Sequence, residues 1–303
     1  GNNIMPSDVI EHISELKSQG AKIIKGDNIK AMEQAAKPEL MRKNLGLKMI
    51  RRANSIGHHY FISNLTSKDI ASSVALAVNE KHGIWYNPMT GEYHEATIGD
   101  KGIQLNLKSG ESRILITSNK PVNEWQLGSN VKVGGKEAIA AADSKTIDLT
   151  GNAWKLSFTE DAPKVGETFN LKGVKSWEGL SDKAKVMMGT GVYETSIKLS
   201  KDDAKKQWAI DLGDVRESAR VYINGEYVGC AWAVPYILNC QNKLVKGKNT
   251  LRIEVTNLPA NRIAEMDRQG VKWRKMKEIN VVDINYKKTT YENWTPVPSG
   301  LNS

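Results

Sequence analysis

Short runs of alternating apolar and polar residues, separated by turn-forming residues, recur along most of this 303-residue chain. Because successive side chains of a strand point to opposite faces, such runs predict strands with one buried face. The first group of runs is Met49–Ala53, His59–Asn64, Ala71–Val78, Ile84–Tyr86, Glu92–Ala96, Ile103–Leu107 and Arg113–Thr117. Seven short strands in about seventy residues predict a small antiparallel β-sandwich over residues 46–118.

The alternating pattern returns over residues 149–303, with more aromatic residues. The predicted strands are Asn152–Phe158, Val192–Leu199, Gln207–Leu212, Ala219–Ile223, Tyr227–Cys230 and Leu251–Val255. Asn224-Gly225 between two such runs is the strongest hairpin signal in the chain. These features predict a jelly-roll domain of about eight strands. Its expected core positions are Ile210, Leu212, Val215, Val221 and Ile223.

The first 45 residues differ from the rest. A capped amphipathic helix begins near Pro6 and ends at Gly20, Ala21–Ile24 suggests a short strand, and Asp27–Ala36 suggests a second helix. One strand cannot form a sheet, so we interpret residues 1–45 as an α/β remnant of a larger unit. Residues 119–148, with an alanine-rich patch, are expected to connect the two sandwiches. The chain opens without an initiator methionine, which suggests a piece of something longer.

Composition excludes several classes of protein. No apolar run approaches the roughly 20 residues of a membrane span. The formal net charge of +9 raises the question of a nucleic-acid partner. Only Lys272–Lys277 combines clustered cations with an aromatic residue, and no recognised binding motif accompanies it, so we expect no nucleic acid. Cys230 and Cys240 are interpreted as small buried residues rather than a disulfide, which would require adjacent strands.

Motifs of nucleophilic, zinc and phosphate-binding enzymes are absent from the sequence. Acidic pairs such as Asp202-Asp203 fall in polar segments typical of solvated surface. No acidic loop has the spacing of a calcium site, so no cofactor is predicted, although sandwiches of this type can hold structural calcium. The tryptophans are the more informative residues, because an exposed indole can bind the apolar face of a sugar. Candidates beside turns are Trp85, Trp177, Trp232, Trp273 and Trp294.

Two series of motifs resemble bacterial α-L-rhamnosidases of glycoside hydrolase family 106. The first comprises Tyr60-Phe-Ile-Ser-Asn64, Trp85-Tyr-Asn-Pro-Met-Thr-Gly91, Leu105-Asn-Leu107 and Glu111-Ser112. The second comprises Gly191-Val-Tyr193, Ile210–Val215, Ala219–Gly225, Val228-Gly229, Trp232, Pro235, Gly247–Leu251, Val255-Thr-Asn257, Asn261-Arg262 and Pro298–Leu301. The second series resembles the galactose-binding-like sandwich of that family, which is similar to the sugar-binding domain of family 2 glycosidases.

The resemblance implies a mainly β fold with two antiparallel sandwiches, the second a galactose-binding-like jelly roll. It also implies that the catalytic barrel lies upstream and is missing here, so we expect no catalytic residue and no hydrolysis by this chain alone. In family 2 enzymes the loop after the corresponding strand can reach the substrate pocket of the barrel. That loop is Asn257–Trp273 here, and we name as candidate carbohydrate contacts Trp232, Asn257, Asn261, Arg262, Asp267 and Trp273.

Several interpretations of function stay open at this stage. The chain is predicted to be the non-catalytic part of an α-L-rhamnosidase-like hydrolase that supports glycan recognition and packs on a barrel. The expected partners are a glycan, such as a rhamnose-containing plant polysaccharide, and the barrel itself, in a periplasmic, cell-surface or secreted setting implied by the resemblance. The alternatives are a free-standing carbohydrate-binding module, a purely structural domain, and a hydrolase with an unrecognised carboxylate pair. In a structural reading Asn257 and Asn261 cap the backbone and Arg262 pairs with Asp267.

Overall fold

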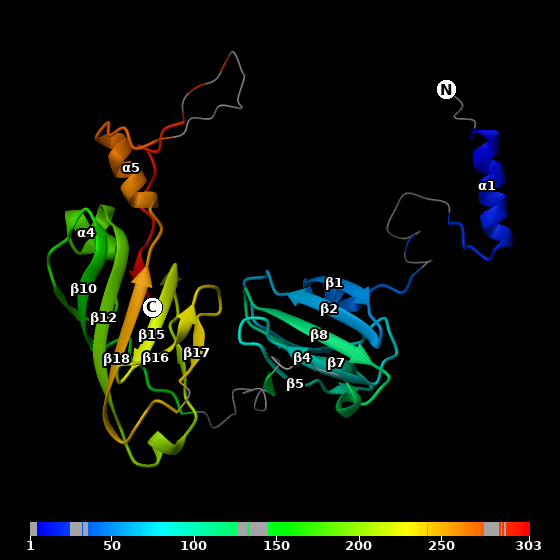
Figure 1. Cartoon of the computed structure of the whole chain (residues 1–303), viewed down its shortest axis with the longest axis horizontal. Helices are drawn as coiled ribbons and strands as arrows, with labels where there is room; N and C mark the ends of the chain where they lie inside the picture. Colours follow the sequence, from blue (N-terminus) through cyan, green and yellow to red (C-terminus); the bar gives the residue numbers. More distant parts are fainter. Residues whose placement is uncertain are drawn as a thin grey trace. The chain divides into compact units, whose positions relative to one another are not determined.

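The computed structural model describes residues 5–24, 32, 36–125, 132–133, 145–240, 242–275, 285, 287 and 289–303. The chain divides into unit 1, residues 1–139, and unit 2, residues 140–303. Both are mainly β (Figure 1). Within the described residues, no helix is long and apolar enough to span a membrane.

Unit 1 begins with helix α1 (Ser7–Ser18), none of whose residues is buried. Helix α3 (Leu40–Leu45) precedes the strands β1 (Lys48–Ala53), β2 (Gly57–Ser63), β3 (Ile70–Val74), β4 (His82–Tyr86), β5 (Glu92–Glu95), β6 (Ile98–Gly99), β7 (Gly102–Leu107) and β8 (Ser112–Ser118); the 3₁₀ turn η1 (Val122–Glu124) and β9 (Lys132–Val133) follow. The order β1-β2-β8-β4-β5-β9 forms one sheet and β3-β7-β6 the other, all antiparallel except β5–β9. Alternation places Tyr60, Trp85 and Leu115 in the core, together with Ile103 and Leu105 of β7.

Unit 2 contains β10 (Ala153–Ala162), β11 (Phe169–Lys172), β12 (Met188–Leu199), β13 (Ala209–Asp211), β14 (Val215–Arg216), β15 (Ser218–Ile223), β16 (Glu226–Ala231), β17 (Ile237–Asn239), β18 (Gly247–Thr256) and β19 (Gly300–Leu301). Its short helical elements are η2 (Trp177–Gly179), α4 (Asp182–Val186), η3 (Asp203–Lys205) and α5 (Ala260–Arg268). The main sheet has the order β11-β10-β12-β18-β15-β16, and the pairs β13–β17 and β14–β19 supply further short sheets. Side chains of all three sheets share one apolar core, as a sandwich requires.

At the centre of this core, Trp177 donates its indole N–H to the hydroxyl of Tyr193 over 2.7 Å. The same hydroxyl accepts the backbone N–H of Leu301 over 3.1 Å. Both aromatic side chains are fully buried, so these bonds join β12 to β19 and η2 inside the sandwich. The structure therefore fixes the C-terminal strand through a polar contact in an otherwise apolar core.

The predicted mainly β fold with antiparallel sheets is confirmed, while several local predictions are wrong. Residues 21–24 form no strand, and β3 ends at Val74 rather than Val78. Most of the predicted helix 27–36 lies outside the described residues. The expected loop Asn257–Trp273 contains helix α5, and β11 and β17 were not predicted. Cys230 and Cys240 are free thiols, and burial raises the pKa of the Cys240 thiol to about 11.

Candidate functional site

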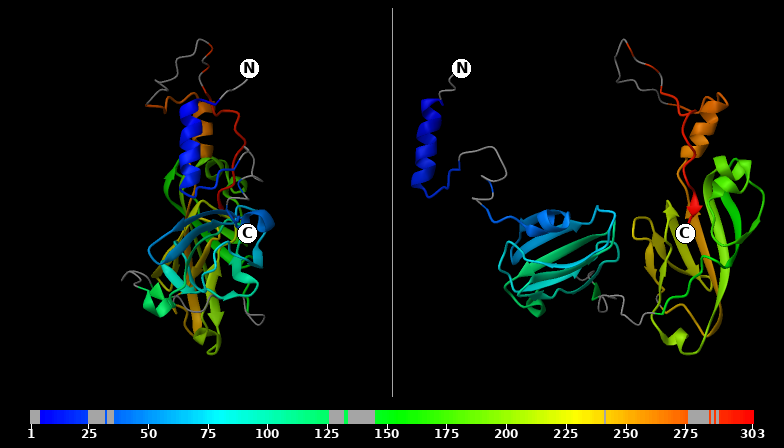
Figure 2. Two further views of the ribbon diagram at one scale, coloured as in Figure 1. Left: turned by 90° about the vertical axis from the view of Figure 1, so that its right-hand side faces the viewer. Right: turned by 180° about the vertical axis from the view of Figure 1, so that it is seen from behind.

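One end of unit 2 carries all the predicted site residues, and strand register shows why. Thr256 at the end of β18 faces Thr190 near the start of β12 and Ser218 at the start of β15. Ala231 at the end of β16 faces Ala219 of β15. Segments that follow β18 and β16 therefore leave the sandwich at the same end, where α4 and α5 also lie (Figure 2). We call this the α5 end.

Two of the predicted contact residues brace the backbone there. Asn257 accepts the N–H of Gly189 over 3.0 Å and donates to the carbonyl of Met187 and the hydroxyl of Ser299. Asn261, which is 5% exposed, pairs with Val297 by donating to its carbonyl and accepting its N–H. Both side-chain amides hold segments together, which matches the structural reading of these two residues.

Asp267 positions the two aromatic residues that follow helix α5. One carboxylate oxygen accepts the indole N–H of Trp273 over 2.7 Å, and the other accepts the backbone N–H of Tyr291 over 2.8 Å. The two rings lie 6.3 Å apart, and the Tyr291 ring lies 4.4 Å from that of Trp294. Three aromatic rings from segments distant in sequence thus form one group.

A guanidinium group lies against this aromatic group. The Arg274 side chain is 5.1 Å from the centroid of Trp273 and 4.9 Å from that of Tyr291, within cation–π range. Arg268 of α5 supports the same segment by donating to the carbonyls of Glu292 and Trp294. We call Trp273, Arg274, Tyr291 and Trp294 the aromatic cluster. Of these four, only the two tryptophans were predicted from the sequence, because nothing in it places residues 273 and 291 together.

The charges on α5 keep the carboxyl group of Glu265 ionised. The hydrogen bond from Arg268 holds the pKa of Glu265 below its usual value, and the charge of half-buried Arg262 acts in the same direction. Glu265 is thus kept as a carboxylate, whereas a general acid at neutral pH requires a raised pKa. Its role is to hold Arg268.

Exposed apolar side chains also gather at the α5 end. Trp232, directly after β16, is 63% exposed, and Trp294 is 48% exposed. The others are Met188, Val234, Leu258, Val271 and Val297. By contrast, Trp85 and Trp177 are buried in the cores of their units and are excluded as ligand contacts. An apolar surface of this kind marks a binding or docking face.

A group of charged residues that was not predicted from the sequence, Asp214, Arg216 and Glu217, lies just before β15. Arg216 pairs with Asp214, with its Nε 2.6 Å from one carboxylate oxygen. Burial, followed by the nearby charge of Glu217, raises the pKa of the Tyr236 phenol. This group adds hydrogen-bonding side chains at the end of the sandwich that bears Trp232.

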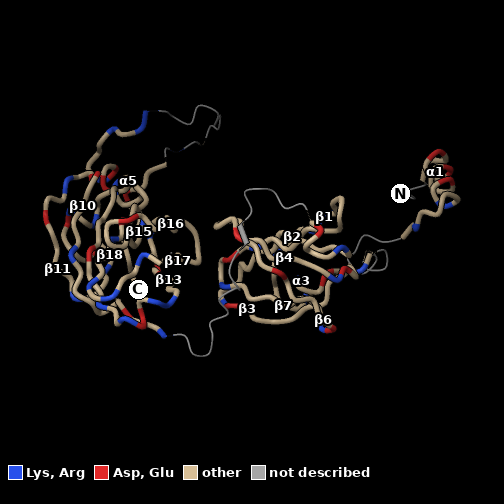
Figure 3. The backbone as a smooth tube through the Cα atoms, turned by 60° about the horizontal axis from the view of Figure 1, so that its bottom comes forward, with Lys and Arg blue, Asp and Glu red and all other residues tan. Residues whose placement is uncertain are grey.

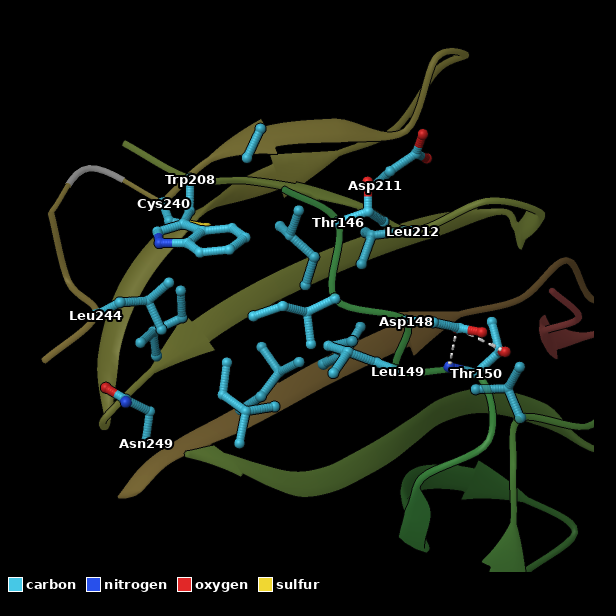
Figure 4. A pocket seen from close by; sticks show the side chains of 18 of the residues that line it. Thr146, Asp148, Leu149, Thr150, Trp208, Asp211, Leu212, Cys240, Leu244 and Asn249 are labelled. Carbon is cyan, nitrogen blue, oxygen red and sulfur yellow. Dashed lines mark hydrogen bonds between the residues drawn. The ribbon is translucent and has the colours of Figure 1, made fainter. Parts of the chain in front are cut away.

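Unit 2 also contains a cavity of about 630 Å³ between the main sheet and the segment 145–150 (Figure 4). Its lining is largely apolar, including Ile197, Leu199 and Trp208. Two of the polar side chains on it are engaged within the protein: Asp148 accepts two hydrogen bonds from Thr150, and Asn249 bonds Val245, Gly247 and Asn224. A sugar needs many hydrogen bonds, so this cavity is a poorer candidate than the α5 end.

Lys and Arg occur on both units (Figure 3). No group of three His, Cys, Asp or Glu side chains able to hold a metal ion occurs in the described part of the chain.

The part of the chain that carries this site is similar to known proteins. Residues 181–298 match the family described as glycosyl hydrolase 2 galactose-binding domain-like. A putative β-glucuronidase of Formosa agariphila is 28% identical over 213 residues, which is 64% of this chain and 18% of that protein.

Among solved structures, a rhamnosidase from Novosphingobium sp. PP1Y matches 96% of this chain and 25% of its own, with a TM-score of 0.59 and 20% identity, which shows the fold. A β-D-glucuronidase from Dictyoglomus thermophilum matches 36% of this chain and 19% of its own at 18% identity, with a TM-score of only 0.32. The chain thus spans a quarter or less of the lengths of these proteins. The α5 end lies within residues 181–298, the part of the chain that is similar to the glycosyl hydrolase 2 galactose-binding-like family.

Proposed function

We propose that this chain is a non-catalytic portion of an α-L-rhamnosidase-like glycoside hydrolase, in which the α5 end of unit 2 faces a glycan. The matching fold over 96% of the chain supports the rhamnosidase-like assignment, beside the motif series in the sequence. This chain spans only 18% of the putative β-glucuronidase. The catalytic domain would therefore come from another part of the protein. The resemblance to such hydrolases implies a periplasmic, cell-surface or secreted setting, and we propose that setting for the protein.

The aromatic cluster is the observation that carries the proposal. A sugar ring offers an apolar face of C–H groups, and indole and phenol rings bind that face while nearby charged groups bind its hydroxyls. Here Trp273 and Tyr291 are held by Asp267, which reduces the entropy lost when a ligand orders them. Trp232 supplies a further, more exposed indole at the same end.

The test is calorimetric titration of the chain with rhamnose, galactose and a rhamnose-containing pectic oligosaccharide. Substitution of Trp273 or Trp232 by Ala should weaken binding at least about tenfold, the effect of losing roughly 1.4 kcal/mol. Tyr222→Ala is the matched control, because Tyr222 also carries a stacked arginine but lies on the outer face of the main sheet. Equal losses in the control and the α5-end variants would contradict the proposed site.

Turnover of p-nitrophenyl rhamnoside, measured in parallel, tests the non-catalytic assignment. We expect none, and hydrolysis that copurifies with the chain and is reduced by Trp273→Ala would overturn that assignment.

A structural role on a catalytic barrel is the second candidate. The exposed Trp232, Val234 and Leu258 favour it, since contiguous apolar surface is rare on a free domain. Absence of binding to all three sugars, with the wild-type chain folded, would favour this role over glycan recognition.

A further inference from the structure

The main sheet of unit 1 carries an apolar row on the face that points away from its core. Register places Ile50 opposite Phe61, Phe61 opposite Ile114, Ile114 opposite Tyr86, and Tyr86 opposite Tyr93. Ile50 is 62% exposed and Phe61 47% exposed, and the other three are half-buried. The outer face of an antiparallel sheet is ordinarily polar. A row that crosses β1, β2, β8, β4 and β5 therefore indicates a surface that is covered in the working protein.

The neighbouring row widens this surface at its centre. Ile116 of β8 faces Ile84 of β4, and both share the outer face because each lies two residues from a member of the first row. Ile84 is only 1% exposed although it lies outside the main core cluster of the unit, so this part of the outer face is already covered, and the open part lies at Ile50 and Phe61. We call Ile50, Phe61, Ile114, Tyr86 and Tyr93 the outer row.

Helix α1 presents an apolar surface of its own. Val9, Ile13 and Leu16 recur at the spacing that places side chains on one helix face. Val9 is 39% exposed and Leu16 37% exposed. A helix of 12 residues is marginal in water on its own, so its stability requires that this face be covered.

Dimensions and charge match the two surfaces. A helix of 12 residues is about 18 Å long, and the distance from β1 to β5 across four strand spacings is about 19 Å. The helix carries Asp8, Glu11 and Glu15 against Lys17, a net charge of −2 with His12 neutral. Lys48 and Arg52 of strand β1 lie two residues on either side of Ile50, so they share its face of the sheet, and both are exposed.

Chain length permits the contact. Residues 19–39 separate α1 from α3, which packs beside the core of unit 1 through the buried Met41. A connection of this length reaches up to about 70 Å at roughly 3.3 Å per residue, several times the width of the sheet. The connection also keeps α1 at a high effective concentration near the outer row.

We propose that α1 docks on the outer row of its own chain, with Val9, Ile13 and Leu16 against Ile50, Phe61 and Ile114. The helix then covers the apolar sheet face of unit 1 and forms a third layer. This role is independent of the glycan surface on unit 2. A second copy of the chain, or another domain, would be a competing occupant of the same face.

Hydrogen exchange of the full chain tests the docking. In the wild type, the amides of α1 should exchange at least about tenfold more slowly than those of a synthetic peptide of residues 5–20, because docking stabilises the helix against local unfolding. Phe61→Lys should remove that protection. The control is Leu65→Lys, an apolar residue 68% exposed in the loop after β2 and outside the outer row.

A second variant guards against unfolding of the sheet. Ile50→Lys lies on edge strand β1 and should release α1 while exchange in β2 and β8 stays at the wild-type level. The proposal is overturned if wild-type α1 exchanges like the peptide, or if its protection survives both Phe61→Lys and Ile50→Lys. Protection that rises with protein concentration would also overturn it, in favour of a second copy as the occupant.

Discussion

Replacing Tyr193 by Phe removes a single oxygen from the centre of unit 2 and should be strongly destabilising. That oxygen accepts the indole N–H of Trp177 over 2.7 Å and the backbone N–H of Leu301 over 3.1 Å. Both donors lose their partner while Trp177 and Tyr193 remain 0% exposed. Each unsatisfied buried donor costs about 1–3 kcal/mol, so we expect a loss of about 2–5 kcal/mol. This is a large fraction of the roughly 5–15 kcal/mol that stabilises a folded domain.

Chemical denaturation followed by tryptophan fluorescence measures this loss, with thermal unfolding as a second assay. For a unit of this size, the loss corresponds to a fall of about 5–15 °C in Tm. Tyr222→Phe is the control, because its hydroxyl lies 3.4 Å from Glu254 at a part-exposed site and should contribute less than about 0.5 kcal/mol. If Tyr193→Phe were as stable as Tyr222→Phe, the hydroxyl would not satisfy the two buried donors, and the argument would fail.

Three further perturbations follow from other contacts. Gly300→Ala places a Cβ 2.3 Å from both Trp177 Nε1 and Tyr193 Oη at a φ of +89°, and should lower the free energy of unfolding by about 2–5 kcal/mol. The control Gly247→Ala, at φ +93°, meets no atom within 4 Å and so measures the cost of the backbone conformation alone. Equal losses of unfolding free energy in the two variants, measured by denaturation, would exclude crowding as the cause. Hydrogen bonds from Lys145 and Ser200 lower the pKa of Asp203 to about 2, so the contribution of its carboxylate to stability is complete above pH 4 and declines as the pH falls toward 2. Asp203→Asn should therefore flatten the dependence of the unfolding free energy on pH between 4 and 2. An unchanged slope would show that Asp203 does not cause this dependence. Glu39→Gln weakens an acceptor shared by Arg51, Tyr60 and the N–H of Ala77, and should lower the unfolding free energy of unit 1 by about 1–3 kcal/mol without altering that of unit 2.

Much of the β architecture follows directly from the sequence. Asn224 and Gly225 adopt φ values of 53° and 82°, the conformation that a two-residue hairpin turn needs, and β15 pairs with β16 across them. Alternation also identified Leu212, Val215, Val221 and Ile223 as buried. Ile210 is only half-buried, since it lines the cavity beside the segment 145–150. Local periodicity therefore predicts which face is apolar, while the completeness of its cover depends on segments elsewhere in the chain.

The sequence could not reveal the aromatic cluster or helix α5. The segment Ala260–Arg268 is mostly polar, and only Asn261 and Ala264 are buried; the resemblance to family 2 enzymes implied a loop there, so its helical spacing was not recognised. Tyr291 lies beside Trp273 across eighteen residues of sequence, and the Asp267 carboxylate, which accepts a hydrogen bond from each of them, together with Arg274, which lies against both rings, brings them together. Strands β11 and β17 are too short for a period of two to be distinct.

The loop position implied by the resemblance to family 2 enzymes suggested Asn257, Asn261 and Asp267 as sugar contacts, and their hydrogen bonds give them a different role at the surface. Each joins segments that come from different parts of the fold: Asn257 joins Met187, Gly189 and Ser299, and Asn261 joins Val297. The polar atoms of these side chains form hydrogen bonds within the protein, so they hold the surface in place instead of presenting donors to a ligand. The groups that remain to meet a ligand are the aromatic faces and the exposed Trp232. A binding surface built in this way selects for the apolar face of a sugar through its rings, and its geometry depends on the amides and the carboxylate beneath them.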